Sequence, residues 1–99
     1  MTKDDGKFRQ SAHLLTRHIA GETIVIPIRG RLADMQRIFA LNEVGEHVWR
    51  LIEQNRSVDE ICAAVEQVFD ISRAEAESDV REFLAELQEA GLVETLSGG

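Results

Sequence analysis

The clearest pattern of apolar and polar positions lies between Ser72 and Val93. At about 100° per residue, six apolar side chains of this stretch share one stripe of a helix, namely Ala76, Val80, Phe83, Leu84, Leu87 and Ala90. Polar residues occupy the opposite side, namely Glu75, Ser78, Glu82, Glu86 and Glu89. We therefore predict a helix that lies on the outside of a small domain and buries one face.

Both ends of this helix carry recognisable signals. Ser72 can accept a hydrogen bond from the amide of Glu75 while that glutamate reaches back, which is the capping box of a helix start. Gly91 marks the end of the helix. Leu92 and Val93 can then fold back onto the core and close the last turn with an apolar contact.

Two more helices are predicted before this one. Asn42 is a good N-cap for a helix with an apolar stripe of Val44, Val48, Leu51 and Ile52. Gly45, inside this helix, is interpreted as a close-packing position. Ser57 and Glu60 form a second capping box, and the helix that follows runs to about Asp70 with a predicted buried face of Ile61, Cys62, Val65, Val68 and Phe69. Only two residues separate it from the next helix, so the last two helices must turn sharply, as in a helix-turn-helix pair.

The N-terminal half shows the pattern of strands instead. Residues 13–19 are a candidate strand, and residues 23–26 are a dense run of β-branched side chains. Pro27 has no amide to donate, so it should lie where pairing ends. A loop over residues 29–36 leads to a third strand at residues 37–41. The short connections predict a three-stranded antiparallel meander whose third strand is an edge.

Length and composition indicate one domain. Ninety-nine residues bury a single core, which we place at residues 11–96, after a mobile arm over residues 1–10 and before a flexible tail at residues 97–99. One cysteine cannot form an intramolecular disulfide, and no apolar run approaches the roughly 18 residues of a membrane span. The first ten residues have no hydrophobic segment of the kind found in a signal peptide. We therefore expect a cytoplasmic α+β protein that has no membrane partner.

The net charge of −7 is unevenly distributed. Residues 1–40 contain seven Lys or Arg and four Asp or Glu, a net of +3, whereas residues 41–99 contain four and fourteen, a net of −10. Nucleic-acid-binding proteins present a basic face to phosphates. Because the predicted helices belong to the acidic part, we expect no nucleic-acid partner.

Residues of the types used in catalysis are present, but not in catalytic patterns. His13, His18 and His47 lack metal-ligand spacing. Cys62 lies on a buried stripe, where a free cysteine behaves as a small hydrophobe, and Trp49 beside the first helical stripe is read as a partly buried packing residue. Nucleotide-binding and nucleophile motifs do not occur in the sequence. We predict no catalytic residue, no metal site and no cofactor, and hence a protein that is not an enzyme.

Several short motifs, taken in order, resemble the PqqD family over roughly residues 13–94. They are Ile24-Val25-Ile26-Pro27, Leu41-Asn42, Ser57-Val58-Asp59-Glu60-Ile61, Asp79-Val80, Phe83-Leu84 and Gly91-Leu92. That family is named for a small protein of pyrroloquinoline quinone biosynthesis, and it is similar to the recognition element of pathways that modify ribosomally made peptides. The resemblance implies a winged helix-turn-helix fold, in which a three-stranded antiparallel sheet is followed by three helices. The loop at residues 29–36 is longer than its counterpart in the pyrroloquinoline quinone proteins, so the pathway stays open.

The resemblance further implies a non-catalytic peptide chaperone that binds the leader of a precursor peptide and presents it to a modifying enzyme, by analogy a radical S-adenosylmethionine (radical SAM) enzyme. The leader would add as a strand to residues 37–41, whose open edge offers unpaired amides and carbonyls. The helix that begins at Ser72 would form the other wall of the groove. The expected contact residues are Arg37, Ile38, Phe39, Ala40, Leu41, Asp79, Val80, Arg81, Phe83, Leu84, Leu87 and Gln88. Apolar peptide side chains should dock against Leu84 and its neighbours, while charges at the rim, Arg37 and Arg81, set orientation and association rate.

Two other functions use the same predicted elements. A winged-helix DNA-binding regulator would use residues 72–90 as its recognition helix, but six acidic residues against Arg73 and Arg81 give that stretch a net of −4, which repels a phosphate backbone. An assembly adaptor would bind a folded partner and no peptide. Two separate titrations, one with the leader peptide and one with the modifying enzyme encoded by a neighbouring gene, distinguish the adaptor from the peptide chaperone.

Overall fold

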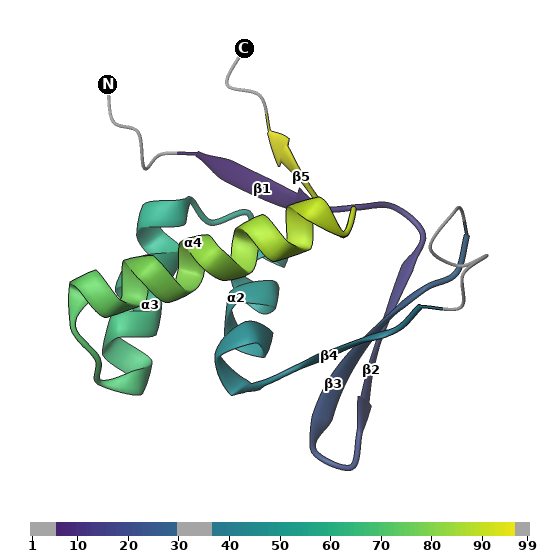
Figure 1. Cartoon of the computed structure of the whole chain (residues 1–99), viewed down its shortest axis with the longest axis horizontal. Helices are drawn as coiled ribbons and strands as arrows, with labels where there is room; N and C mark the ends of the chain where they lie inside the picture. The colour runs from purple at the N-terminus through teal and green to yellow at the C-terminus, as the bar shows by residue number, and fades with distance from the viewer. Residues whose placement is uncertain (1–5, 30–36, 97–99) are drawn as a thin grey trace.

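Two antiparallel sheets and three helices make up the part of the chain that the computed structural model describes, residues 6–29 and 37–96. In chain order the elements are β1 (Lys7–Gln10), β2 (Leu14–Ile19), β3 (Glu22–Pro27), β4 (Phe39–Leu41), α2 (Glu43–Glu53), α3 (Val58–Phe69), α4 (Arg73–Glu89) and β5 (Val93–Leu96). Figure 1 shows α4 running across α2 and α3, with the β2-β3-β4 sheet to one side. Most of the predicted loop at 29–36 and the predicted tail at 97–99 lie outside the described residues.

The predicted three-stranded meander is confirmed. β3 lies between β2 and β4 and is antiparallel to both. Pro27 is the last residue of β3, as its missing amide requires. Ala20 and Gly21 connect β2 to β3 with φ angles of 53° and 83°, and positive φ at both positions is what a two-residue type I′ hairpin turn needs. β4 is shorter than predicted, since its pairing with β3 runs only from Phe39 to Leu41.

A second sheet, which the sequence pattern did not predict, joins the two ends of the described chain. β1 pairs with β5 in antiparallel register from Lys7 with Leu96 to Gln10 with Val93. Residues 7–10 were expected in a mobile arm, so the arm prediction is corrected for this strand, while residues 1–5 lie outside the described part. A strand of four residues has little local signature, and this one exists because a partner from the other end of the chain supplies its hydrogen bonds.

The three helices begin where the caps predicted. Asn42 Oδ1 accepts from the Gly45 amide at 2.7 Å, and the capping box of Ser57 and Glu60 is complete in both directions. At the start of α4, Ser72 accepts from the Glu75 amide at 3.1 Å, and the return bond predicted for these two residues does not form. The caps therefore account for the positions of all three starts.

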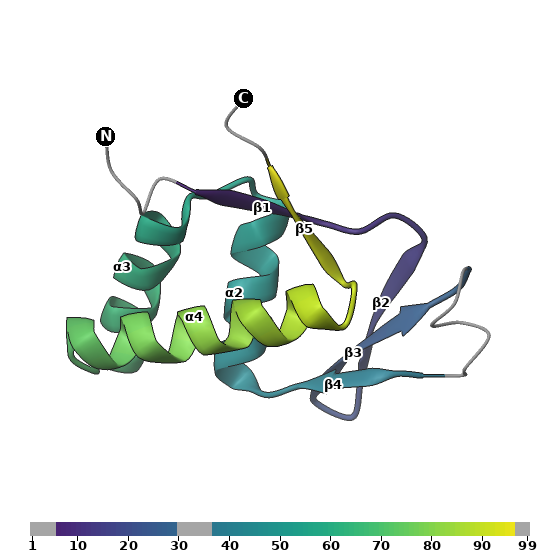
Figure 2. The ribbon, with the colours of Figure 1, turned by 45° about the horizontal axis from the view of Figure 1, so that its top comes forward.

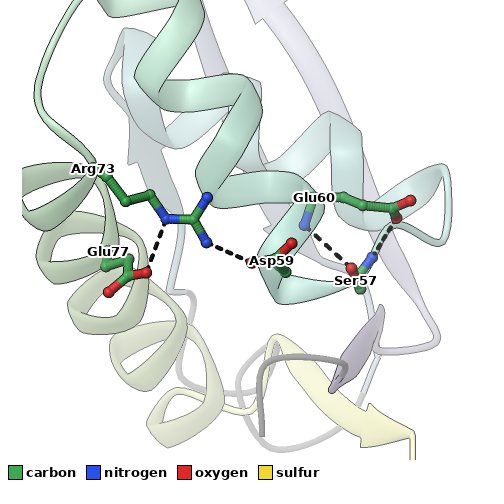
Figure 3. A network of polar contacts seen from close by, with 5 residues as sticks. All are labelled: Ser57, Asp59, Glu60, Arg73 and Glu77. Atoms are coloured by element: carbon green, nitrogen blue, oxygen red, sulfur yellow. Dashed lines mark hydrogen bonds and ion pairs between the residues drawn. The ribbon is translucent and has the colours of Figure 1, made fainter. Parts of the chain in front are cut away.

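A charged network joins the first turns of α3 and α4 (Figure 3). Arg73 Nε donates to Glu77 at 2.8 Å within α4, and Arg73 Nη2 donates to Asp59 of α3. These bonds, the one to Glu77 first, raise the pKa of the Arg73 guanidinium. The predicted sharp turn precedes this network, where Asp70 adopts a left-handed φ of 53°. The network therefore ties α4 to α3 directly after the turn.

The core collects side chains from every helix and from both sheets. Its buried members are Val25, Leu41, Val48, Trp49, Ile52, Val58, Ile61, Cys62, Val65, Ala76, Val80, Leu84, Leu87, Leu92 and Val93. Cys62 is buried as predicted, and Trp49 is buried more deeply than predicted, at 3% exposure, with its Nε1 donating to Thr16 Oγ1 at 3.2 Å. The assignment of Val68 to the buried face of α3 is wrong, because its side chain is 57% exposed.

Candidate functional site

A groove of about 570 Å³ lies between the edge strand β4 and the C-terminal half of α4. Figure 2 shows the two elements with the end of α4 pointing toward the β2-β3-β4 sheet. The residues that line the groove are Arg37, Ile38, Phe39, Ala40, Leu41, Phe83, Glu86, Leu87, Glu89, Ala90 and Leu92. The groove therefore has a strand edge as one wall, a helix as the other and apolar side chains between them.

The strand wall is open for pairing along its outer side. β4 is the last strand of its sheet and pairs only with β3 among the described strands. Within it Leu41 is buried and Phe39 is half-buried, whereas Ala40 between them is exposed, as alternation across a sheet requires. The Arg37 guanidinium lies over the Phe39 ring, 5.3 Å from its centroid, which places a positive charge at this wall.

The helix wall is held by the way α4 ends. The amide of Gly91 donates to the Gln88 carbonyl at 3.0 Å, and the amide of Leu92 donates to the Leu87 carbonyl at 2.9 Å. Gly91 has φ of 81°, and together these features make a Schellman motif. The motif turns Leu92 back under the helix, where it is fully buried, as the sequence predicted. Leu87 and Leu92 thus lie side by side at the base of the groove.

The structure brings together most, but not all, of the residues that the sequence assigned to the site. All five from β4 and its approach, residues 37–41, line the groove together with Phe83 and Leu87. Val80 and Leu84 are buried in the core instead. Asp79 lines an adjoining hollow.

Arg81 and Gln88 stand apart from the other predicted contacts. Neither lines the groove, and at 100° per residue both lie roughly half a turn around α4 from Asp79. Both side chains are exposed. The structure therefore places Arg37, but not Arg81, at the rim of the groove.

The sequence pattern missed four of the lining residues. Glu86 and Glu89 were assigned to the solvent face, and Ala90 and Leu92 to the core. The signal that identifies the glutamates is their spacing from Asp79, because positions seven and ten residues onward return to the same side of a helix. That spacing is visible in the sequence, but the sequence pattern does not show which element lies opposite this side of the helix.

Close packing between α2 and α4 positions the Phe83 ring. A Cβ added at Gly45 would lie 3.0 Å from Phe83 Cζ and 3.2 Å from Asn42 Oδ1. The prediction that Gly45 is a close-packing position is therefore confirmed. The absence of a side chain at Gly45 lets the Phe83 ring lie against the first turn of α2.

If the groove binds the leader peptide that the resemblance implies, replacing Gly45 by Ala should lower the affinity for that peptide with little loss of stability. The added methyl group pushes the Phe83 ring toward the groove, while alanine improves helix propensity by about 0.5 to 1 kcal/mol. The affinity is measured by titrating the variant and the parent with the leader peptide, and the stability is measured by a denaturation curve of the same variant. Unchanged affinity would mean that the position of this ring does not shape the binding surface.

A second polar cluster lies on the inner side of the β2-β3 hairpin against α2. His18 Nδ1 is 3.1 Å from Thr23 Oγ1, and the hydrogen bond from Arg50 chiefly lowers the pKa of Glu46, with a smaller contribution from His18. Three or more His, Cys, Asp or Glu side chains arranged to hold a metal ion do not occur among the described residues. The described helices also include none long and apolar enough to cross a membrane. The groove therefore stays the best candidate site.

Comparison with known proteins gives one family match and two structures of similar fold. A family model described as Coenzyme PQQ synthesis protein D (PqqD) matches residues 13–93, which confirms the resemblance found in the motifs. TbiB1, solved in complex with the TbiA(beta) leader peptide, is 27% identical with a TM-score of 0.75, over 87% of this chain and 94% of that chain. Lasso peptide synthetase B1, complexed with the leader peptide, has a TM-score of 0.77 over 89% of this chain and 98% of that chain, and at 15% identity it shows the fold alone. Comparison with curated proteins gave no match.

Proposed function

Because the chain belongs to the PqqD family, we propose that it is a non-catalytic domain that binds the leader segment of a ribosomally made precursor peptide. The observation that carries the proposal is the groove of about 570 Å³ along the open edge of β4. The similar protein TbiB1 was solved with a leader peptide, which supports the same class of ligand here. The peptide adds to β4 as a further strand, gaining main-chain hydrogen bonds from the edge and side-chain contacts from the groove.

The bound leader would be presented to a modifying enzyme in the cytoplasm. By analogy with pyrroloquinoline quinone biosynthesis, for which the family is named, we expect that enzyme to be a radical SAM protein. The competing function, DNA binding, is disfavoured by the charge of α4, whose exposed surface carries Glu75, Glu82 and Glu86. A phosphate backbone brought to this surface would meet repulsion instead of releasing counterions.

The proposal can be tested by substitutions that place a large side chain either in the groove or elsewhere on the same helix. Ala90 lines the groove, whereas Ala85 is exposed on α4 and does not. Ala90→Phe should weaken binding of the short peptide encoded beside the gene by about tenfold or more, a loss of about 1.4 kcal/mol. Ala85→Phe, the matched control, should leave the affinity within about a factor of two. NMR titration of both variants and the parent gives the affinities and the residues whose amide signals move.

The parent should show shifts at residues 37–41 and along α4. Equal binding by the parent and by Ala90→Phe, with shifts elsewhere, would place the peptide at another surface. A parent that binds none of the short peptides encoded nearby, but binds the neighbouring enzyme, would instead favour the assembly adaptor.

A further inference from the structure

The two walls of the groove carry opposite charges. Arg37 lies on the β4 wall, while Glu86 and Glu89 lie on the α4 wall. Between these charges lie apolar side chains, with Phe83 and Leu87 on the helix side. An extended peptide in this groove would therefore meet different chemistry on its two sides.

The acidic wall extends beyond the groove itself. A hollow of about 300 Å³ shares Phe83 and Glu86 with the groove and adds Asp79 and Glu82. It is bounded on its other side by the start of α2, which directly follows β4. A peptide that runs along β4 past its last residue thus enters the hollow, where the helix wall becomes more acidic.

These carboxylates have no cationic partner within the described residues. Asp79, Glu82, Glu86 and Glu89 make none of the ion pairs between residues that the structure describes, whereas Glu77 on the same helix is paired with Arg73. These four carboxylates form the acidic wall, whose part in the groove faces the open edge of β4 across the apolar side chains. A peptide laid against it removes water from the carboxylates, which costs free energy unless the peptide supplies positive charge.

The spacing of side chains along an extended peptide indicates which peptide position should carry the positive charge. Alternate side chains of an extended strand face the same way at intervals of about 6.8 Å, and Leu87 in the groove and Glu82 in the hollow are separated by about 7.5 Å along the helix axis. A peptide side chain that packs on Leu87 is therefore followed, two residues away, by one that faces the acidic hollow at Glu82. An acidic side chain at that position is excluded by like charge.

We infer that the groove selects leader segments in which a large apolar residue and a Lys or Arg lie two positions apart. The inference rests on the proposed function, since it specifies which peptides the same groove takes. The apolar residue contacts Leu87, and the basic residue faces Glu82 and Glu86 in the adjoining hollow.

Selection from a random peptide library tests the inference without knowledge of the natural leader. The full chain is immobilised and binders are selected from displayed random 12-residue peptides. Selected peptides should contain an aliphatic or aromatic residue with Lys or Arg two positions away, enriched roughly two- to fivefold over chance, as expected for partly exposed ion pairs. The enrichment should decline at high salt.

Paired variants assign the preference to the acidic wall. The double variant Glu82→Gln with Glu86→Gln should still select peptides that compete with those of the parent, but without the basic preference. The control double variant, Glu66→Gln with Glu75→Gln, makes the same change of net charge away from the groove and should keep the preference.

The outcomes separate the two proposals. Selection of no peptide at all would contradict the proposed function and with it the inference. Peptides that bind the groove, with shifts at residues 37–41, but show no basic preference would overturn the inference and leave peptide binding standing. Equal loss of the preference in both double variants would also overturn the inference, because the effect would then reflect overall charge.

Discussion

Replacing Ile61 by Ala lowers the free energy of unfolding by about 2 to 5 kcal/mol, the range for truncating a fully buried aliphatic side chain. Ile61 lies on α3, is 0% exposed and is among the largest fully buried side chains of the chain. Domains of this size are stable by only about 5 to 15 kcal/mol. The variant should therefore lose a large part of the total stability and melt roughly 10 to 30 °C lower.

The matched control lies on the same helix. Val68 is 57% exposed, so Val68→Ala should change the free energy of unfolding by less than about 0.5 kcal/mol. Urea denaturation of both variants and the parent measures the difference. Because Ile61 does not line the groove, the fraction of Ile61→Ala that remains folded should bind peptide as the parent does. Equal destabilisation by the two substitutions would contradict the burial that distinguishes the two positions.

The second large effect is expected on the peptide side of the interface. If the leader adds to β4 as a strand, every second peptide amide faces the strand edge. Methylating two such amides removes two hydrogen-bond donors and adds bulk between the strands, so affinity should decline by about a hundredfold or more, at roughly tenfold for each 1.4 kcal/mol lost. Moving both methyl groups by one residue places them on the outward-facing amides, where the loss should be within about fivefold.

Fluorescence anisotropy with the two methylated peptides makes this comparison without changing the protein. The alternation is the diagnostic result, because side-chain docking alone would make both peptides behave alike. β2 is the other edge of the same sheet, but it contributes no residue to the groove. Combining the inward-methylated peptide with Ala90→Phe then tests whether the sensitive edge is that of β4, since the two losses share one site and should not add.

The helices were predictable because their signals are local. Asn42, Ser57 and Ser72 each cap a helix that starts at the next residue, and a side chain three or four positions away completes each apolar stripe. The hairpin of β2 and β3 was predictable for the same reason, since its two strands are adjacent in the chain. Most of the groove followed from these elements, because an edge strand and the last helix were its expected walls.

Errors arose where burial depends on a distant neighbour. Val68 falls on the predicted apolar face of α3, yet no element of the described fold covers it, and it is 57% exposed. Trp49 lies beside the predicted stripe of α2, yet β2 approaches closely enough for Thr16 to accept its indole hydrogen bond. A helical wheel gives the direction of a side chain but not the position of the element that lies in that direction.

The sequence alone determined the order of β2, β3, β4 and the three helices, the positions of the helix starts and the acidic character of α4, because each depends on residues within a few positions of one another. Only the tertiary structure decided that β1 pairs with β5, that Glu86 and Glu89 face a groove instead of open solvent, and that Arg81 lies on the other side of the helix. The physical reason is common to all three. They depend on contacts between segments far apart in the chain, whose geometry is set by how the whole core packs and not by any local pattern.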